Sequence, residues 1–325
     1  DVYAEPTTAP AVQADSFSGA GTSVQGSKTF HVASVEAYSS WTTAASGYTM
    51  EALGPDYLSE GLYYRASGED PWKSEIPQTF TTLYVKTAGD NTVMTAEQMK
   101  AVADAVKALA APATVDFSEV VYESETFPNT FKSNANLAGI VFPQNVTKTA
   151  SAAFQKTGMT SVTLLKGISY GSNAFDSCAS LVSVTVEEGV TEIGNYMFQN
   201  TKLTDVTLPN SVTKIGASAF NGCSLTTINF GQGVKTIENS AFQNCGELTE
   251  IILPDATETL GQNAFGDCPK LAKISLGKNM KTLEAYCFVG YSKGCPLLGD
   301  IICRATTPPT LKDDYGTGPF GGGWS

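Results

Sequence analysis

Hydrophobic residues are irregularly spaced at the start of the chain and become strictly periodic from about residue 126. Phenylalanine then recurs at a nearly constant spacing of roughly 22–23 residues. The positions are Phe131, Phe154, Phe175, Phe198, Phe220, Phe242, Phe265 and Phe288. A unit of this length cannot bury its own apolar side, so neighbouring units must stack around a shared core. The pattern predicts a repeat solenoid over residues 126–309, with one rung for each phenylalanine.

After each phenylalanine comes a short block whose first, fourth and sixth positions are apolar. Leu203, Val206 and Leu208 show this pattern, and its last positions alternate as in a half-buried strand. Proline or glycine then turns the chain, as at Pro209 and Gly231. We expect a mostly β architecture that is poor in α-helix.

The repeated units resemble the leucine-rich repeats of the BspA-like surface proteins of bacteria over about residues 112–312. The unit of that family reads leucine, two variable residues, a hydrophobic residue, a variable residue, leucine and proline. Isoleucine-glycine, alanine-phenylalanine and cysteine follow. The rungs that begin at Leu203 and Leu248 match nearly everywhere. The resemblance implies a right-handed superhelix in a secreted or surface-displayed protein that adheres to a host or matrix protein without catalysing a reaction.

Four parts are expected outside the repeats. Residues 1–26 are rich in Ala, Thr, Ser, Gly and Pro, which indicates a flexible linker. Residues 27–78 are aromatic and β-prone, and we assign them no fold. Residues 79–125 predict a cap over the open apolar end of the solenoid. Residues 310–325 predict a C-terminal cap or a tail.

The N-terminal cap should contain a helix and two strands. Residues 82–86 alternate as a strand does, and residues 113–118 predict the opening strand of the solenoid. Between them, Thr95 and Gln98 have the spacing of a capping box, so we expect a helix over about residues 95–110. Its apolar face should pack on the first rung.

The charge distribution argues against two classes of partner. Residues 1–126 carry 17 acidic and 6 basic side chains, whereas residues 127–325 carry 15 and 14. The total of −12 leaves no basic surface for nucleic acid. No apolar run reaches the roughly 18 residues of a membrane span, so attachment would need a lipid or wall tether upstream of residue 1.

Few side chains are suited to catalysis. His31 is the one histidine, which excludes any site with several histidines, and no serine nucleophile motif occurs. We therefore expect no enzyme, no catalytic residue, no cofactor and no metal site. An enzyme centred on His31 or on paired carboxylates is the weakest alternative.

The seven cysteines fall into two groups. The first group lies three residues after a repeated phenylalanine, which predicts buried thiols of the core rather than metal ligands. It consists of Cys178, Cys223, Cys245 and Cys268. Disulfides between neighbouring rungs are disfavoured there because the Cβ vectors would be parallel. One bridge is more plausible in the second group, near the terminal rung: Cys287, Cys295 and Cys303.

Outward strand positions predict two rows of small, mostly uncharged side chains. The first row is Val141, Thr163, Thr185, Thr207, Asn229, Ile252 and Ser275. The second row is Gly139, Ser161, Ser183, Asp205, Thr227, Glu250 and Lys273. Such a face suits the binding of a protein partner, and it equally suits the solubility of a plain β-sheet.

Two further functions stay open at this point. The aromatic residues of segment 27–78 could stack on sugars, with Trp41 and Trp72 as the platforms of a glycan-binding protein. A stiff solenoid could also act as a structural spacer.

Overall fold

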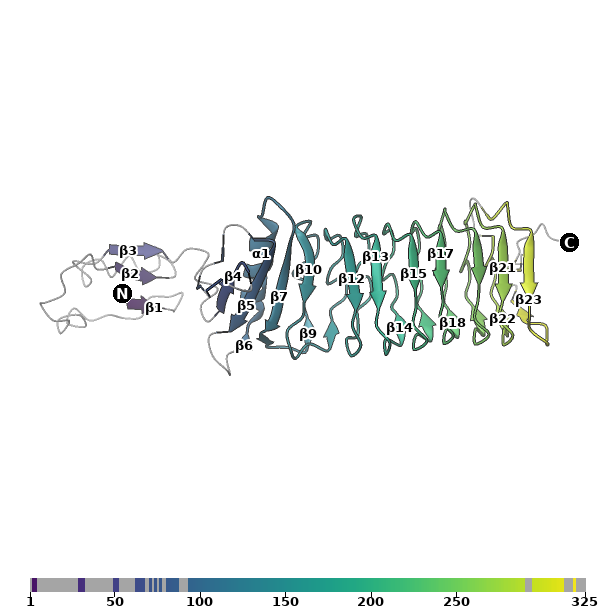
Figure 1. The fold of residues 1–325 in the computed structure, drawn as a ribbon, viewed down its shortest axis with the longest axis horizontal. Helices are drawn as coiled ribbons and strands as arrows, with labels where there is room; N and C mark the ends of the chain where they lie inside the picture. The colour runs from purple at the N-terminus through teal and green to yellow at the C-terminus, as the bar shows by residue number, and fades with distance from the viewer. Residues whose placement is uncertain are drawn as a thin grey trace, which may run out of the picture.

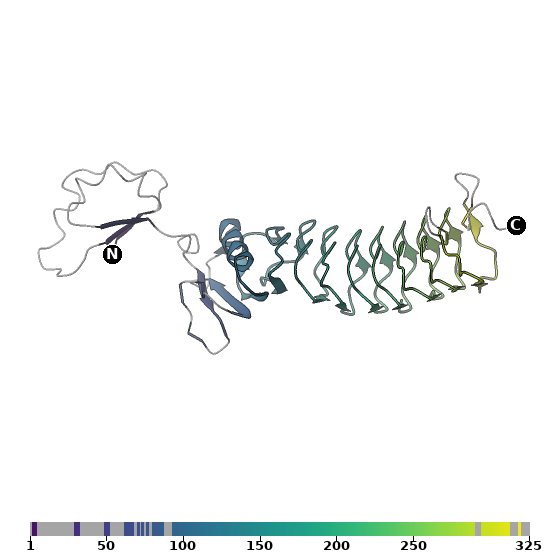
Figure 2. The same cartoon turned by 90° about the horizontal axis from the view of Figure 1, so that it is seen from above.

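The computed structural model describes residues 2–4, 29–32, 49–52, 62–67, 70–71, 73–74, 76–77, 80–87, 93–289, 294–312 and 318–319. Within these residues the regular elements are strands, apart from helix α1 (Ala96–Lys107). The repeats form a solenoid whose rungs stack along the long axis of the molecule (Figures 1 and 2). The fold is therefore a mostly β, parallel-strand solenoid, as the period predicted.

Each rung has three sides. The first face carries one strand per rung: β10 (Leu137–Val141), β12 (Ser161–Leu164), β13 (Ser183–Val186), β15 (Asp205–Thr207), β17 (Thr227–Asn229), β19 (Glu250–Ile252), β21 (Lys273–Leu276) and β23 (Asp300–Cys303). The second face carries two-residue strands: β9 (Thr126–Phe127), β11 (Lys148–Thr149), β14 (Glu192–Ile193), β16 (Lys214–Ile215), β18 (Thr236–Ile237), β20 (Thr259–Leu260), β22 (Thr282–Leu283) and β24 (Thr310–Leu311). In the β12 rung the second face has only a single bridge from Ser169 to Lys148. The third side is a turn that carries the repeated phenylalanine.

The third-face turns need a left-handed backbone on both sides of the phenylalanine. Ala152 and Lys156, with φ of 59° and 58°, flank Phe154 in this way. The equivalent positions in later rungs are Asn173, Ser177, Tyr196, Asn200, Ser218, Gly222, Ser240, Asn244, Asn263 and Asp267. Glycine, asparagine and other small polar residues predominate there because the left-handed region is costly for larger side chains. This backbone lets the N–H of Phe154 donate to the carbonyl of Ala174 in the next rung at 2.9 Å.

The phenylalanine rings form a continuous column inside the solenoid. Successive ring centroids are 5.2–5.6 Å apart and the ring planes lie within 29° of parallel. The stacked rings belong to Phe127, Phe154, Phe175, Phe198, Phe220, Phe242 and Phe265. Phe131 stacks in turn on Phe127, with the centroids 5.9 Å apart and the ring planes at 17°. Phe127, from strand β9 of the second face, thus lies in the column between Phe131 and Phe154.

The N-terminal cap continues the architecture of the rungs. Strands β4 (Leu62–Arg65), β5 (Thr82–Thr87) and β7 (Ala113–Glu119) join β10 in one sheet of order β10-β7-β5-β4. Strand β6 (Val93–Met94) pairs with β8 (Val121–Tyr122). Helix α1 stands between β6 and β7, where a rung would have its third-face turn, so the cap covers the apolar end with the same chain order as a repeat.

Helix α1 begins as predicted but ends earlier. Thr95 and Gln98 form the capping box, and the buried side chains include Met99 and Val106. The expected range to residue 110 is too long, since the helix ends at Lys107. The side chain of Asn136 donates to the carbonyls of Lys107 and Leu109 at 3.0 and 2.7 Å. Pro112 also disfavours helical backbone just before it.

Two expected boundaries near the N-terminus are crossed by strand pairing. Strand β4, from the segment expected at 27–78, pairs antiparallel with β5 of the cap. Strand β1 (Val2–Ala4), inside the expected linker 1–26, pairs in parallel with β2 (Thr29–Val32), which also pairs with β3 (Thr49–Ala52). Strand pairing of this kind needs partners far apart in sequence, which composition does not reveal.

The C-terminal end is closed by the last residues of the chain. Strand β24 pairs with β22 on the second face. On the third face, the N–H groups of Tyr286 and Phe288 donate to the carbonyls of Gly318 and Pro319, at 3.0 and 3.4 Å. These contacts give part of segment 310–325 the position of one more rung.

Opposite charges pair between the β19 and β21 rungs. All four acidic residues lie on the β19 rung and all four lysines lie one repeat later: Glu247–Lys270, Glu250–Lys273, Asp255–Lys278 and Glu258–Lys281. Exposed pairs of this kind contribute little stability singly, about 0–1 kcal/mol each. A shift of one residue in register would separate all four pairs.

Candidate binding surface

The outward side chains of the first face lie side by side where neighbouring strands pair. Strand pairing places Thr163 beside Thr185, Thr207 beside Asn229, and Ile252 beside Ser275. In the second row, Asp205 pairs with Thr227 and Glu250 with Lys273. These side chains are exposed, except that Ser275 and Lys273 are half-buried. Whether the rows bind a partner stays a prediction.

The backbone ladder beneath these rows is interrupted. The strands of the first face divide into four sheets: β10 with the cap, β12-β13, β15-β17 and β19-β21-β23. The breaks correlate with the length of a short connection that precedes each strand. This connection runs from the residue three positions after the repeated phenylalanine to the first apolar residue of the strand block. Two residues separate Asn134 from Leu137 before β10, whereas a single residue separates Thr157 from Met159 before β12.

All three breaks occur where this connection changes length. The connections that enter β10, β13, β19, β21 and β23 are long, and those that enter β12, β15 and β17 are short. The junctions β10/β12, β13/β15 and β17/β19 each join a long and a short connection. The junction β12/β13 also changes length and remains paired, so a change is needed for a break but does not force one.

A hollow of about 400 Å³ lies at the β17/β19 break. Asn229 and Phe230 border it on one side, and Ile252 and Leu253 border it on the other. A second hollow, of about 380 Å³, lies at the β10/β12 break and is lined in part by Phe142. Interrupted pairing therefore opens the strand face at both places.

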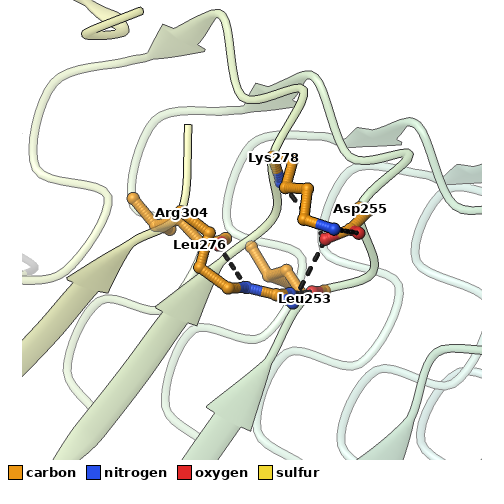
Figure 3. A network of polar contacts seen from close by, with 5 residues as sticks. All are labelled: Leu253, Asp255, Leu276, Lys278 and Arg304. Carbon is orange, nitrogen blue, oxygen red and sulfur yellow. Dashed lines mark hydrogen bonds and ion pairs between the residues drawn. The ribbon is translucent and has the colours of Figure 1, made fainter. Parts of the chain in front are cut away.

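Arg304 reaches into the first hollow from the terminal rung. Its Nε donates to the carbonyl of Leu276 at 3.2 Å and its Nη2 to that of Leu253 at 2.9 Å. Its Nη1 lies 3.2 Å from Oδ1 of Asp255, while Nζ of Lys278 lies 3.0 Å from Oδ2 (Figure 3). Lys278 chiefly, with Arg304, lowers the pKa of Asp255. One guanidinium thus connects three rungs and forms a fixed cationic border.

Two apolar side chains are exposed on this part of the first face, one at the hollow and one two strands away. Ile252 is 59% exposed, and Ile302, which pairs with the other side of Ser275, is 44% exposed. The sequence rows ended at Ser275 and missed Ile302 and Arg304. The final rung begins later in the sequence than a regular repeat would, because Lys273 pairs with Asp300. The regular spacing of the other rungs therefore did not predict its strand. The apolar pair Ile301 and Ile302 before Cys303 was the available signal.

The alternative site residues from the sequence have no described side chains. Trp41 and Trp72 lie outside the described residues. His31 lies on β2, of which the structure describes the backbone.

The described residues hold no group of three or more His, Cys, Asp or Glu side chains placed to bind a metal ion. In the same part of the chain, no helix has the length and apolar character needed to cross a membrane.

The three-sided rungs, the phenylalanine column and the buried cysteines three residues after the repeated phenylalanines define a leucine-rich-repeat solenoid. The model of the family described as BspA type leucine rich repeat region matches in six copies, over residues 115–170 and 168–294. These ranges cover more than half of the chain, which belongs to this family. A comparison with curated proteins found no match.

The solved structures with similarity to the chain include two described as leucine-rich proteins of bacteria. A leucine-rich cell surface protein of Faecalibacterium prausnitzii is 22% identical with a TM-score of 0.43, and the match covers 59% of this chain and 60% of that one. A leucine-rich repeat protein of Eubacterium ventriosum is 20% identical with a TM-score of 0.38, covering 62% and 68%. The pneumococcal vaccine antigen PcpA is 17% identical with a TM-score of 0.29, covering 61% and 69%. The chain thus spans less than two thirds of the F. prausnitzii protein.

Proposed function

We propose that this chain is a non-enzymatic binding module, secreted or held at the cell surface, that engages a protein partner through the outward first face of its solenoid. Membership in the BspA-type family supports this role. Residues 1–126 carry the acidic excess, whereas the solenoid is almost neutral. A neutral surface is suited to a protein contact that does not depend on a basic or acidic polymer.

The observation that carries this proposal is the pair of exposed isoleucines on the first face, of which Ile252 lines the β17/β19 hollow and Ile302 lies two strands away. Ile252 and Ile302 present apolar side chains at 59% and 44% exposure on a rigid strand face. Stable interfaces centre on apolar anchors that are surrounded by polar groups. The neighbouring hollow of about 400 Å³ is large enough for one inserted side chain.

The polar border of the hollow favours a partner that presents an apolar side chain next to a carboxylate. Toward the described residues, the guanidinium of Arg304 donates two hydrogen bonds and forms one ion pair, while it carries five N–H donors. Arg304 and Lys278 together outnumber the single carboxylate of Asp255. A carboxylate of the partner would complete this network without leaving a buried charge unpaired.

The proposal is tested on the full chain, with an array of extracellular-matrix proteins and glycans. Saturable binding to a matrix protein is expected, and Ile252→Asp should weaken it by at least about tenfold because it places a charge at the apolar anchor. Leu311→Asp is the matched control, since Leu311 is 52% exposed but lies on β24 of the second face. Equal loss in both variants, or none in either, would contradict binding through the first face.

The array also distinguishes the other functions. Binding to glycans that is lost in Trp41→Ala or Trp72→Ala and kept in Ile252→Asp would replace this proposal with the sugar-binding one. If the chain binds no member of the array, the structural spacer is favoured.

A further inference from the structure

Small polar side chains form a second column inside the solenoid, which we call the thiol column. Its members are Thr157, Cys178, Thr201, Cys223, Cys245, Cys268 and Cys295. Each cysteine of the column donates its thiol to a phenylalanine carbonyl of the preceding rung, at 3.0–3.3 Å. Contact runs from rung to rung, as between Thr201 and Cys223 at 3.2 Å.

Cys295 belongs to this column although it lies seven residues after Phe288 rather than three. Its thiol donates to the carbonyl of Phe265 at 3.3 Å, as Cys268 does to Phe242 at 3.2 Å. Strand pairing between the last two rungs gives the same spacing. Lys273 pairs with Asp300, and Cys268 and Cys295 are separated by the same number of residues as that pair. Equivalent positions on paired parallel strands lie about 4.8 Å apart, within the Cα range of disulfides.

The two thiols influence each other and differ in environment. Each thiol donates its proton to a phenylalanine carbonyl, Cys268 to Phe242 and Cys295 to Phe265. The neighbouring Cys268 thiol is the chief cause that lowers the pKa of Cys295, whereas the Cys295 thiol and burial raise the pKa of Cys268. Cys268 is fully buried, whereas Cys295 is half-buried at the end of the column, where solvent reaches it.

We propose that Cys268 and Cys295 are an oxidation site, at which hydrogen peroxide converts two thiols into one disulfide across the last two rungs. The Cys295 thiolate attacks the peroxide oxygen to form a sulfenic acid, and the oxygen–oxygen bond breaks to release hydroxide, or water after protonation. The Cys268 sulfur then attacks the Cys295 sulfur, and the sulfenic hydroxyl leaves as water with the proton of Cys268. Both sulfurs are oxidised and one peroxide is reduced to two waters.

The pair differs from the bridge that the sequence favoured, and it joins neighbouring rungs, where parallel Cβ vectors disfavour a bridge between regularly packed cysteines. Cys295 is half-buried at the end of the column, so its side chain is less confined by packing than those of the inner cysteines. All seven cysteines are free thiols in this structure. Cys287 is buried on the third face, where its carbonyl accepts the N–H of Phe265 at 2.8 Å. Cys303 is exposed at the end of β23, in register with Leu276. Neither one lies in the thiol column, so the structure favours Cys268 over both as the partner of Cys295.

The remaining thiols of the column lack access to an oxidant. Cys178, Cys223 and Cys245 are at most 2% exposed. Oxidation should therefore be confined to the C-terminal end of the column. A bridge there would hold the rung that carries Ile302 and Arg304 to its neighbour.

The test treats the full native chain with hydrogen peroxide, alkylates the remaining thiols, and maps the peptides by mass spectrometry without reduction. The expected product is a peptide containing Cys268 joined to one containing Cys295, with the loss of two hydrogens, restored by dithiothreitol. The thermal unfolding midpoint should rise by about 3–8 °C on oxidation. Cys295→Ser should abolish both effects, and the matched variant Cys303→Ser should keep them.

Three results would overturn the proposal. Cys295 could bridge to Cys287 or Cys303, it could advance to a sulfinic acid while Cys268 remains alkylatable, or both could stay reduced at peroxide levels that oxidise the exposed Cys303. Peptide mapping of the unmutated chain distinguishes these results, so the test does not depend on whether a variant folds.

Discussion

Seven phenylalanine rings stack without a gap inside the solenoid, at 5.2–5.6 Å, while the strands on its outward first face divide into four sheets over the same rungs. The two regions obey different constraints. A break in the interior would leave a cavity that apolar neighbours cannot fill. A break on the surface leaves polar backbone groups that water can reach, so it is tolerated.

The surface breaks also create what the regular interior lacks. A perfectly regular sheet would present a flat face, whereas the change in connection length at β17/β19 opens a hollow beside Ile252. Regular repeats thus provide rigidity, and small irregularities in them provide sites that differ from rung to rung.

The largest expected effect comes from breaking the interior column. Phe220 is fully buried, and its ring lies 5.5 Å from Phe198 and 5.2 Å from Phe242. Phe220→Ala should lower the free energy of unfolding by about 3–5 kcal/mol, measured by urea denaturation. Tyr196→Ala serves as the control, because Tyr196 is 39% exposed. A similar loss in both variants would contradict the column as the source of stability.

The thiol column predicts a smaller effect at alkaline pH. Burial raises the pKa of Cys223 to about 11 from about 9. The folded state therefore favours the neutral thiol, so this contribution is complete below pH 9 and is lost as the pH rises through 11. The shift corresponds to about 2–3 kcal/mol of unfolding free energy.

Urea denaturation at pH 8 and pH 10.5 measures that loss. Cys223→Ser keeps a donor for the Phe198 carbonyl but does not ionise, as Thr201 already shows in the same column. The variant should therefore lose less stability than the original chain between the two pH values. An unchanged pH dependence would show that Cys223 does not titrate on unfolding.

The smallest effect is expected on the outward rows. Thr207→Lys adds a charge at an exposed position between short side chains. Its unfolding free energy should stay within about 0.5 kcal/mol of the original value, measured in urea. A loss comparable to that of Phe220→Ala would mean that the rows are part of the core rather than a free surface.

Local patterns predicted the parts of the fold that depend on neighbouring rungs. The period revealed the solenoid, the capping box revealed the start of helix α1, and the position after each phenylalanine revealed the buried thiols. The ends of the solenoid were harder to predict from the sequence, because they depend on individual contacts that are not repeated in other rungs. Asn136 ends the helix through contacts with carbonyls that lie a full repeat or more earlier in the chain.

The sequence by itself determined the family and the mostly β architecture, because each rung buries its apolar side against the next and so repeats the same pattern. Only the tertiary structure decided that Cys295 enters the thiol column, that Ile302 extends the first row, and that Arg304 reaches back two rungs to Leu253. The physical reason is that a longer connection before the last rung breaks the period but keeps the strand register. Hydrogen bonding between strands then fixes positions that spacing along the chain does not reveal.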